Sequence, residues 1–289
     1  MSNKVGILGG GFGLYGYLPA FANLKYEIFT LSKYESFVRK RADLNKYIRD
    51  INFLKEENLV SEVDYICIAR NPESQYEFLV NYKNYEFDHL YLEKPIAHNP
   101  AAYKKCIENL EIQKTNFSVF YSLTYMDWYS NIVTEIMQGV DQNFLIEWKI
   151  KQSASTWKQD SSKGGGLLKF YGIHFIKMFI DSNLLLKDTK MSKNKLELYL
   201  ESKNLNSLKI KIEYSNKNLF SIYKNKQIQI NSSNPFLNEI IPELPDPRIK
   251  ILEKYIQSNF NNSLVLEKNI EIWLNLIKQK ITNSSKSAK

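Results

Sequence analysis

The sequence predicts an α/β protein of two domains: a parallel, helix-covered sheet first, then an α+β domain with an open-faced, mainly antiparallel sheet. Two observations support this prediction. Short apolar segments alternate with helical patterns up to about residue 117, and several short strands then follow one another. We therefore expect domains at residues 1–117 and 118–281, and a polar, disordered tail at 282–289.

The composition favours a cytoplasmic protein without disulfides. The 289 residues suffice for two domains, each with its own core. Cys67 and Cys106 form neither a disulfide framework nor a metal-ligand spacing, so we expect a reducing compartment and no metal. The sequence has no secretory leader pattern and no apolar run of about 18 residues, so we expect no membrane partner.

The formal charge of +8 favours anionic partners, but it does not by itself indicate a nucleic-acid-binding protein. The lysines are scattered, which is typical of a solvated surface, and no nucleic-acid-binding module is recognisable. We expect no nucleic-acid partner, and a phosphate-bearing ligand needs only a few of these charges.

Residues 5–16 have the pattern of a strand, a tight glycine turn and the start of a helix. Glycines allow such a turn to close and allow backbone N–H groups to approach a pyrophosphate at the helix N-terminus. Gly11, Gly13 and Gly16 match the G-x-G-x-x-G spacing, but Gly9, Gly11 and Gly13 begin directly after the strand. We prefer the second register, with Phe12 in the turn. A glycine-rich turn without a ligand is the alternative.

A second strand is expected at residues 26–31, followed by a helix at 37–47. An acidic residue at the end of this strand would bind the ribose hydroxyls of NAD. The sequence has Ser32 and Lys33 there, a pair that suits the 2′-phosphate of NADP, although Glu35 is close enough to reach a ribose. NADP is therefore slightly favoured over NAD.

Two further strands of the first domain end in polar residues. Residues 63–69 are nearly all apolar and lead into a turn and helix start that contain Arg70, Asn71, Pro72 and Gln75. The strand at 89–92 leads directly into Glu93-Lys94-Pro95. Ligands of open α/β sheets bind at these carboxyl ends, so Lys94 is a candidate for substrate contact. An ordinary surface lysine is the alternative.

The second domain is predicted from a run of short strands. We expect strands at 117–124, 144–153, 195–201, 207–214, 219–223 and 227–231, a hairpin turn at 224–225, and helices at 128–139, 248–258 and 266–281.

A glycine run, 164–166, precedes a helical pattern at residues 167–178 that contains one histidine. Phe170 and Tyr171 lie four and three residues before His174, so both aromatic side chains neighbour the imidazole on the helix surface. Histidine is well suited to exchange a proton at neutral pH. A hydrogen-bonded core histidine is the alternative.

Together these motifs resemble the glucose–fructose oxidoreductase and inositol dehydrogenase family. The glycine turn at 9–13 with Leu18-Pro19-Ala20 is similar to the family's first turn and helix, and Glu93-Lys94-Pro95 to its Glu-Lys-Pro motif. The glycines at 164–166, continuing to His174, resemble its substrate helix. The three motifs occur in the family's order along nearly the whole chain.

The resemblance implies an N-terminal Rossmann domain that binds NAD or NADP, and hydride transfer on a sugar or cyclic polyol. Lys94 would contact the reacting hydroxyl or carbonyl, and His174 would act as acid and base. A nucleotide-linked sugar for bacterial surface glycans fits the basic charge, and a homo-oligomer is expected by analogy. The implied cofactor contacts are Gly9, Gly11, Phe12, Gly13, Ser32, Lys33, Arg70, Asn71, Pro72, Gln75, Glu93 and Lys94. The implied substrate contacts are Lys94, Tyr121, Tyr125, Trp157, Phe170 and His174, and Trp128 is a further aromatic that could stack on a sugar.

The sequence departs from the family pattern at three positions. Phe170 replaces an aspartate, Tyr17 replaces a histidine after the glycine turn, and Gln75 replaces another histidine. Without the aspartate, His174 loses one possible orienting partner, and we expect the hydroxyl of Tyr171 to replace it as part of the catalytic group. The alternative function is a catalytically silent dinucleotide-binding sensor or scaffold.

Overall fold

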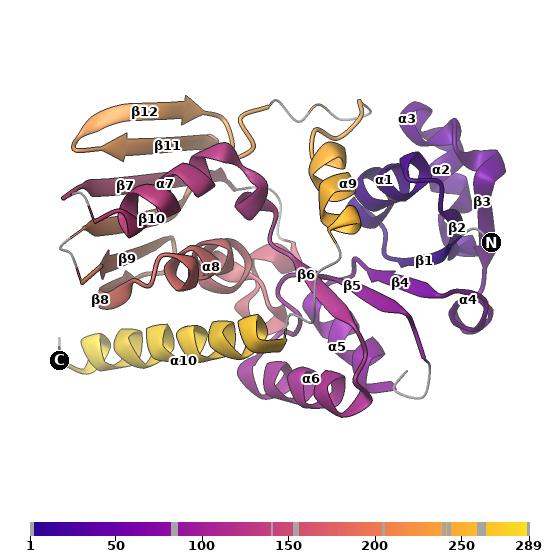
Figure 1. Cartoon of the computed structure of the whole chain (residues 1–289), viewed down its shortest axis with the longest axis horizontal. Helices are drawn as coiled ribbons and strands as arrows, with labels where there is room; N and C mark the ends of the chain where they lie inside the picture. The colour runs from indigo at the N-terminus through magenta and orange to yellow at the C-terminus, as the bar shows by residue number, and fades with distance from the viewer. Residues whose placement is uncertain are drawn as a thin grey trace. The chain divides into compact units, whose positions relative to one another are not determined.

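The computed structural model describes residues 3–81, 86–139, 141–152, 156–203, 206–238, 241, 244–258 and 264–287. The chain forms two compact units, Met1–Ser122 with Ile240–Val265, and Leu123–Glu239 with Leu266–Lys289. Each unit contains one six-stranded sheet, and Figure 1 shows the helices that accompany each sheet.

The first sheet is entirely parallel, with strand order β3-β2-β1-β4-β5-β6. Its strands are β1 (Lys4–Leu8), β2 (Glu27–Leu31), β3 (Ile51–Leu54), β4 (Tyr65–Ile68), β5 (His89–Glu93) and β6 (Phe117–Phe120). Apolar strands of this kind are buried on both faces, and the adjacent residues Ile7 and Leu8 of β1, which point to opposite faces, are both fully buried. The strand order reverses beside β1, and ligands of such sheets bind outside the carboxyl ends at this reversal. The glycine turn follows β1 at that position.

The helices of the first unit are α1 (Leu18–Asn23), α2 (Glu35–Lys40), α3 (Ala42–Asn45), α4 (Glu56–Glu62), α5 (Pro72–Asn81), α6 (Pro100–Gln113) and α9 (Ile249–Gln257). The start of α6 illustrates how local residues begin a helix. The side chain of Asn99 accepts a hydrogen bond from the Ala102 amide at 2.9 Å, and Pro100 occupies the first turn of α6. Helix α9 returns to this unit from the C-terminal part of the chain and contacts α1.

The second sheet has strand order β12-β11-β7-β10-β9-β8 and is antiparallel except for the pair β7 and β10. Its strands are β7 (Asn143–Lys151), β8 (Leu185–Met191), β9 (Lys195–Glu201), β10 (Ser207–Ser215), β11 (Leu219–Lys224) and β12 (Gln227–Ser232). Leu208, Ile210 and Ile212 of β10 are buried on one face. The alternate residues are partly exposed on the other face, where Lys211 pairs with Glu147 at 3.0 Å. This confirms the predicted open-faced, mainly antiparallel sheet.

The second unit also contains α7 (Asp127–Met137), α8 (Ile173–Asp181) and most of α10 (Leu264–Ser287). Helix α10 buries Ile270 and Ile277, and its Trp273 ring lies 5.3 Å from the ring of Phe179 on α8. None of the helices in the described ranges has the length and apolar character that crossing a bilayer requires.

Several predicted elements need correction. The strand predicted at 117–124 ends at Phe120 and is the sixth strand of the first sheet, where it pairs with β5. The helix predicted at 37–47 is broken at Arg41, whose backbone is extended (φ −92°, ψ 120°). The hairpin turn between β11 and β12 lies one residue later than predicted, at Asn225 and Lys226. Both have positive φ, as a tight hairpin requires.

The prediction of a disordered tail at 282–289 was wrong for residues 282–287, which continue α10. No proline or glycine interrupts the helix there, and the Thr282 hydroxyl donates a hydrogen bond to the Lys278 carbonyl at 3.0 Å. Residues 288–289 lie outside the described ranges. Strands β3 and β8 were not predicted.

Candidate functional site

The structure favours a residue without a side chain at each of the three glycines predicted to form the turn. A Cβ atom at Gly9 would overlap the backbone of Ala69, which follows β4. Gly11 has φ +53°, a conformation that favours glycine. A Cβ atom at Gly13 would lie only 3.2 Å from the Cβ atom of Ala69. These are a tight turn, a left-handed backbone and a close helix–strand approach, the uses that dinucleotide-binding turns make of glycine.

The helix after this turn begins without a competing anion. Gly13–Tyr17 forms a π-helical turn that continues into α1. The residue at the N-cap, Phe12, makes no side-chain cap bond, and no acidic residue lies in the first turn. The positive end of the helix therefore has no carboxylate of its own turn beside it, which suits an anionic ligand.

The ring of Phe12 is clamped in place by a residue from the far end of the chain. The Arg248 guanidinium lies 4.1 Å from the ring centroid, and the Phe120 ring stacks with Phe12 at 6.2 Å and 16°. Arg248 in turn makes two hydrogen bonds to the carboxylate of Asp246, at 2.9 and 2.7 Å. Gly16 is needed here because a Cβ atom would overlap the Phe12 ring. The alternative register included Gly16, and the structure explains this glycine by its contact with the Phe12 ring.

Ser32 and Lys33 follow β2 directly and are both exposed. The Lys33 ammonium lies 5.3 Å from the centroid of the Tyr34 ring, and that ring packs against Gly10 of the turn. Glu35, the acidic alternative, pairs with Arg39 on α2 at 2.6 Å. The end of β2 therefore presents a serine and a cation beside the glycine turn.

Two of the predicted cofactor contacts have structural partners at the end of β4. The Arg70 guanidinium forms a two-bond ion pair with Glu56. Asn71 caps α5, because its side chain accepts a hydrogen bond from the Ser74 amide at 2.9 Å. Pro72 is buried as the first residue of α5. The charge of Arg70 is thus already compensated within the protein.

The Glu93-Lys94-Pro95 segment is held by Gln75, which is completely buried. The Gln75 side-chain amide donates to the carbonyls of Glu93 at 2.7 Å and Pro95 at 3.3 Å, and its oxygen accepts from the Glu93 amide at 3.2 Å. The Glu93 carboxylate accepts a hydrogen bond from the Tyr17 hydroxyl at 2.9 Å. Lys94 itself is only 8% exposed, so it is not an ordinary surface lysine.

In the second unit, a glycine run begins the helix that carries the histidine. Gly164 and Gly166 have φ of +85° and +88°, and a Cβ atom at Gly165 would overlap the backbone at Trp157 and Lys158. The chain then forms a π-helical turn, Leu167–Gly172, that continues into α8. The helix predicted at residues 167–178 is confirmed, and its first six residues form a π-helix, which is wider than an α-helix.

His174 is buried beside a cluster of aromatic rings. Its ring lies 6.5 Å from that of Trp148, and the Tyr171 ring lies 5.3 Å from Trp148 and 6.4 Å from Tyr214. Burial and the neighbouring Tyr214 raise the pKa of Tyr171 to about 12, so its hydroxyl stays protonated at neutral pH. No hydrogen bond joins Tyr171 to His174 among the described residues, so the expected orienting bond is not seen.

The other aromatic candidates differ in their surroundings. Phe170 packs edge-to-face on Trp157 at 5.2 Å, with the Lys158 ammonium 5.5 Å from the Phe170 ring centroid. Trp128 is buried and donates its indole N–H to the Pro235 carbonyl at 2.9 Å, which is a structural role.

Tyr121 is buried in the first unit, and Tyr125 is partly exposed in the second. The described ranges contain no group of three histidine, cysteine or carboxylate side chains placed to hold a metal ion.

Comparison with solved structures identifies the fold. The WlbA (WbpB) dehydrogenase from Thermus thermophilus, solved with NAD and UDP-GlcNAcA, matches with a TM-score of 0.68 at 14% identity. The match covers 96% of this chain and 94% of that one. A myo-inositol dehydrogenase from Corynebacterium glutamicum matches with a TM-score of 0.67 at 12% identity, over 100% and 98% of the two chains. GenD2 from gentamicin A biosynthesis, solved with NAD, matches with a TM-score of 0.70 at 7% identity, over 98% and 95%.

The chain has the two-domain fold of the glucose–fructose oxidoreductase and inositol dehydrogenase family. No protein-family model matches the sequence, and no curated protein matches it. At these identities the similarity establishes the dehydrogenase fold, and the chemistry has to be argued from this chain's own residues.

In this dehydrogenase fold, the first unit holds the glycine turn, the end of β2 and Lys94, and the second unit holds His174 and its aromatic neighbours. Sequence reasoning missed Arg248 as a partner of the turn, and it assigned Gln75 to the cofactor although the structure shows a backbone clamp. Arg248 gives no local signal because it lies more than 200 residues after Phe12. Gln75 likewise gives no local signal, because its partners, Glu93 and Pro95, lie 18 and 20 residues later in the chain.

Replacing Gln75 with leucine is expected to destabilise the first unit by about 2–4 kcal/mol, because buried backbone groups of Glu93 and Pro95 lose their hydrogen-bond partners. Urea unfolding measures this difference. Gln257→Leu, at an exposed position in α9 of the same unit, is the control and should stay close to wild type. Equal stability of the two variants would contradict the proposed clamp.

Proposed function

We propose that this protein is an oxidoreductase that uses NAD or NADP to transfer a hydride to or from a sugar or sugar derivative. The observation that supports the proposal is the glycine turn, because Gly9, Gly11 and Gly13 have positions and surroundings that resemble those of glycines in dinucleotide-binding turns. The turn lies at the carboxyl end of β1, beside the reversal of strand order. Its helix start has no acidic residue that would repel a pyrophosphate.

The residues of the first unit fit a nicotinamide dinucleotide. The glycine turn and the start of its helix would hold the pyrophosphate, while Ser32 and Lys33 would meet the adenosine ribose. A bound nicotinamide would supply the hydride acceptor or donor. Because Glu35 is paired with Arg39, we propose that Ser32 and Lys33 favour NADP through its 2′-phosphate. The solved dehydrogenases named above contain NAD, so both cofactors need to be measured.

Lys94 and His174 have the chemistry that oxidation of a hydroxyl requires. We propose that the Lys94 ammonium polarises the substrate oxygen and that His174 takes or gives its proton. The Gln75 clamp fixes the backbone on both sides of Lys94, so the side chain starts from a defined position. Trp157 and Phe170, with Lys158 beside them, offer apolar and cationic groups to a sugar or its phosphate.

The substrate class that we propose is a nucleotide-linked sugar. The WlbA dehydrogenase of the same fold was solved with UDP-GlcNAcA, and the net charge of +8 on this chain favours a phosphate-bearing ligand. A cytoplasmic location and assembly into a homo-oligomer through the open face of the second sheet are parts of the same proposal.

The test is turnover with a panel of substrates, in which nucleotide-linked sugars are compared with free sugars and inositols. Each is incubated with oxidised and with reduced NAD and NADP, and the nicotinamide absorbance is followed. We expect at least one nucleotide-linked sugar to change the absorbance in wild type and not in Lys94→Ala. Cofactor binding without turnover of any sugar would contradict the oxidoreductase proposal and favour a silent dinucleotide-binding protein.

A further inference from the structure

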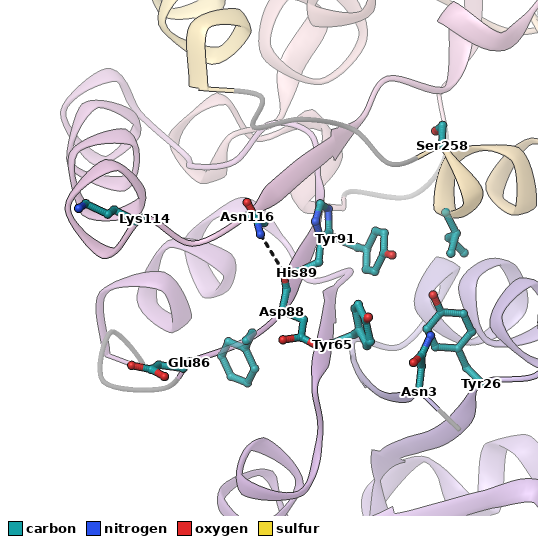
Figure 2. A pocket seen from close by; sticks show the side chains of 12 residues that line it. Asn3, Tyr26, Tyr65, Glu86, Asp88, His89, Tyr91, Lys114, Asn116 and Ser258 are labelled. Carbon is teal, nitrogen blue, oxygen red and sulfur yellow. Dashed lines mark hydrogen bonds between the residues drawn. The ribbon is translucent and has the colours of Figure 1, made fainter. Parts of the chain in front are cut away.

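The first unit has a cavity of about 810 Å³ at the end of its sheet opposite the glycine turn. Figure 2 shows it from close by. Tyr65 and His89 begin β4 and β5, Tyr26 directly precedes β2, and Asn3 directly precedes β1. Because all six strands are parallel, these positions are the amino ends of the strands, whereas cofactor-type ligands bind at the carboxyl ends. The cavity is therefore separate from the proposed cofactor site.

Aromatic rings form one wall of this cavity. The Tyr26 and Tyr65 rings lie 5.6 Å apart edge to face, the Tyr65 and Tyr91 rings 6.5 Å apart, and the His89 and Tyr91 rings 4.6 Å apart. In Figure 2 the three labelled tyrosines lie beside one another across the ends of neighbouring strands. Tyr91 is buried behind the others, so the partly exposed rings of Tyr26 and Tyr65 face the cavity, and their packing holds them in fixed positions.

The imidazole in this wall is fixed by a buried hydrogen-bond chain. His89 Nε2 is 2.8 Å from the Ser118 hydroxyl, which is 2.7 Å from the Tyr255 hydroxyl on α9. Burial lowers the pKa of His89 to about 4, so the ring is uncharged at neutral pH. His89 therefore contributes an aromatic surface and no positive charge.

The charged side chains that line this cavity, as far as the structure describes them, sum to a net negative charge, although the whole chain is basic. Glu86 and Asp88 line it, against a single lining cation among its described residues, Lys114. Asp64 adds a further carboxylate beside Tyr65: after burial, the charges of Asp88 and Asp64 are among the causes that raise the pKa of Tyr65. Asp88 lies next to Tyr65 in Figure 2. The combination of carboxylates and aromatic rings attracts cations.

We propose that this cavity is a binding site for a small organic cation, namely a protonated amine carried on a ring-sized apolar body. The amine would approach Asp88 and the Tyr65 phenol, and the apolar body would pack on the tyrosine rings. The cavity volume falls in the range of small-molecule sites, about 300–1,000 Å³. An anion of the same size would meet two lining carboxylates and one lysine, so its net interaction with the lining charges would be repulsive. A neutral ring would keep the stacking and lose the charge attraction.

The test uses three isosteric probes with the full-length chain at neutral pH: benzylamine, which is cationic, benzyl alcohol, which is neutral, and benzoate, which is anionic. Binding is measured by calorimetry and by chemical-shift changes of the tyrosine rings. We expect benzylamine to bind at least about 5-fold more tightly than benzyl alcohol, and benzoate not to bind at about 10 mM.

Substitutions inside and outside the cavity test whether benzylamine binds there. Asp88→Asn should weaken benzylamine binding about 5-fold or more, and Asp141→Asn, at an exposed position in the second unit, should leave it unchanged. Tyr65→Leu serves as a second variant, and circular dichroism checks that each variant is folded.

Four results would each overturn the proposal. They are no benzylamine binding at about 10 mM, binding of benzyl alcohol or benzoate as tight as that of benzylamine, equal effects of the two aspartate variants, or no effect of Asp88→Asn and Tyr65→Leu. None of these results bears on cofactor binding at the glycine turn, which is tested separately.

Discussion

Replacing Lys94 with alanine is expected to lower turnover by about 10²-fold or more, while the melting temperature stays close to that of wild type. The side chain is only 8% exposed and follows β5, at the carboxyl end of the first sheet. The backbone on either side is held by hydrogen bonds from Gln75, which the substitution leaves in place.

Steady-state kinetics with the substrate found in the panel measures this effect. Lys104→Ala is the control, because Lys104 is an exposed lysine on α6 whose ion pair with Glu108 spans 3.8 Å. It should keep the wild-type rate. If Lys94→Ala retained most of its activity, Lys94 would have no part in the chemical step.

Replacing His174 with alanine is expected to cost about 10²- to 10⁴-fold in turnover, whereas Tyr171→Phe should cost less than about 3-fold. The hydroxyl of Tyr171 makes no hydrogen bond to His174 among the described residues, and its raised pKa of about 12 keeps it protonated. Its ring packs on Trp148 and Phe170, and phenylalanine preserves that packing. We therefore predict that His174 performs the acid–base step without the hydroxyl of Tyr171.

The two single variants and the double variant are compared by kcat and kcat/KM. Tyr223→Phe, a partly exposed tyrosine of β11 in the same unit, is the control for loss of a phenol. A different result would arise if Tyr171 and His174 worked as one group. In that case each single change would cost nearly as much as the double change.

The fold could be predicted from the sequence where the signal is local. The apolar residues before Gly9 and the Glu-Lys-Pro segment are patterns of a few adjacent residues. The first forms β1, and the second begins at the last residue of β5, as expected. Strands β3 and β8 could not be found in this way. β3 is an edge strand of the first sheet in which only Ile51 is buried, and β8 is an edge strand of the second sheet with exposed Lys187 and Asp188. Pairing with a neighbouring strand defines them, and pairing is not visible in a local pattern.

The candidate site was predictable only in part, for the same reason. Gly11 has a positive φ that its residue type indicates, but the partner of Phe12 is Arg248, which reaches the turn from the start of α9. The side chains of Gln75 and Asn71 were assigned to the cofactor because they lie at a strand end. The structure shows that both are used by the protein's own backbone. Position at a site therefore does not distinguish residues that bind a ligand from residues that hold the site together.

Binding of a nicotinamide dinucleotide at the glycine turn is tested most directly by titrating the protein with NADPH and with NADH and following the nicotinamide fluorescence. We predict binding of at least one of them in the micromolar range, on the order of −8 kcal/mol, with NADPH the tighter because Ser32 and Lys33 follow β2. Tenfold tighter binding of NADH would contradict the role given to Ser32 and Lys33. If neither cofactor bound at millimolar concentration, the dinucleotide site itself would be refuted.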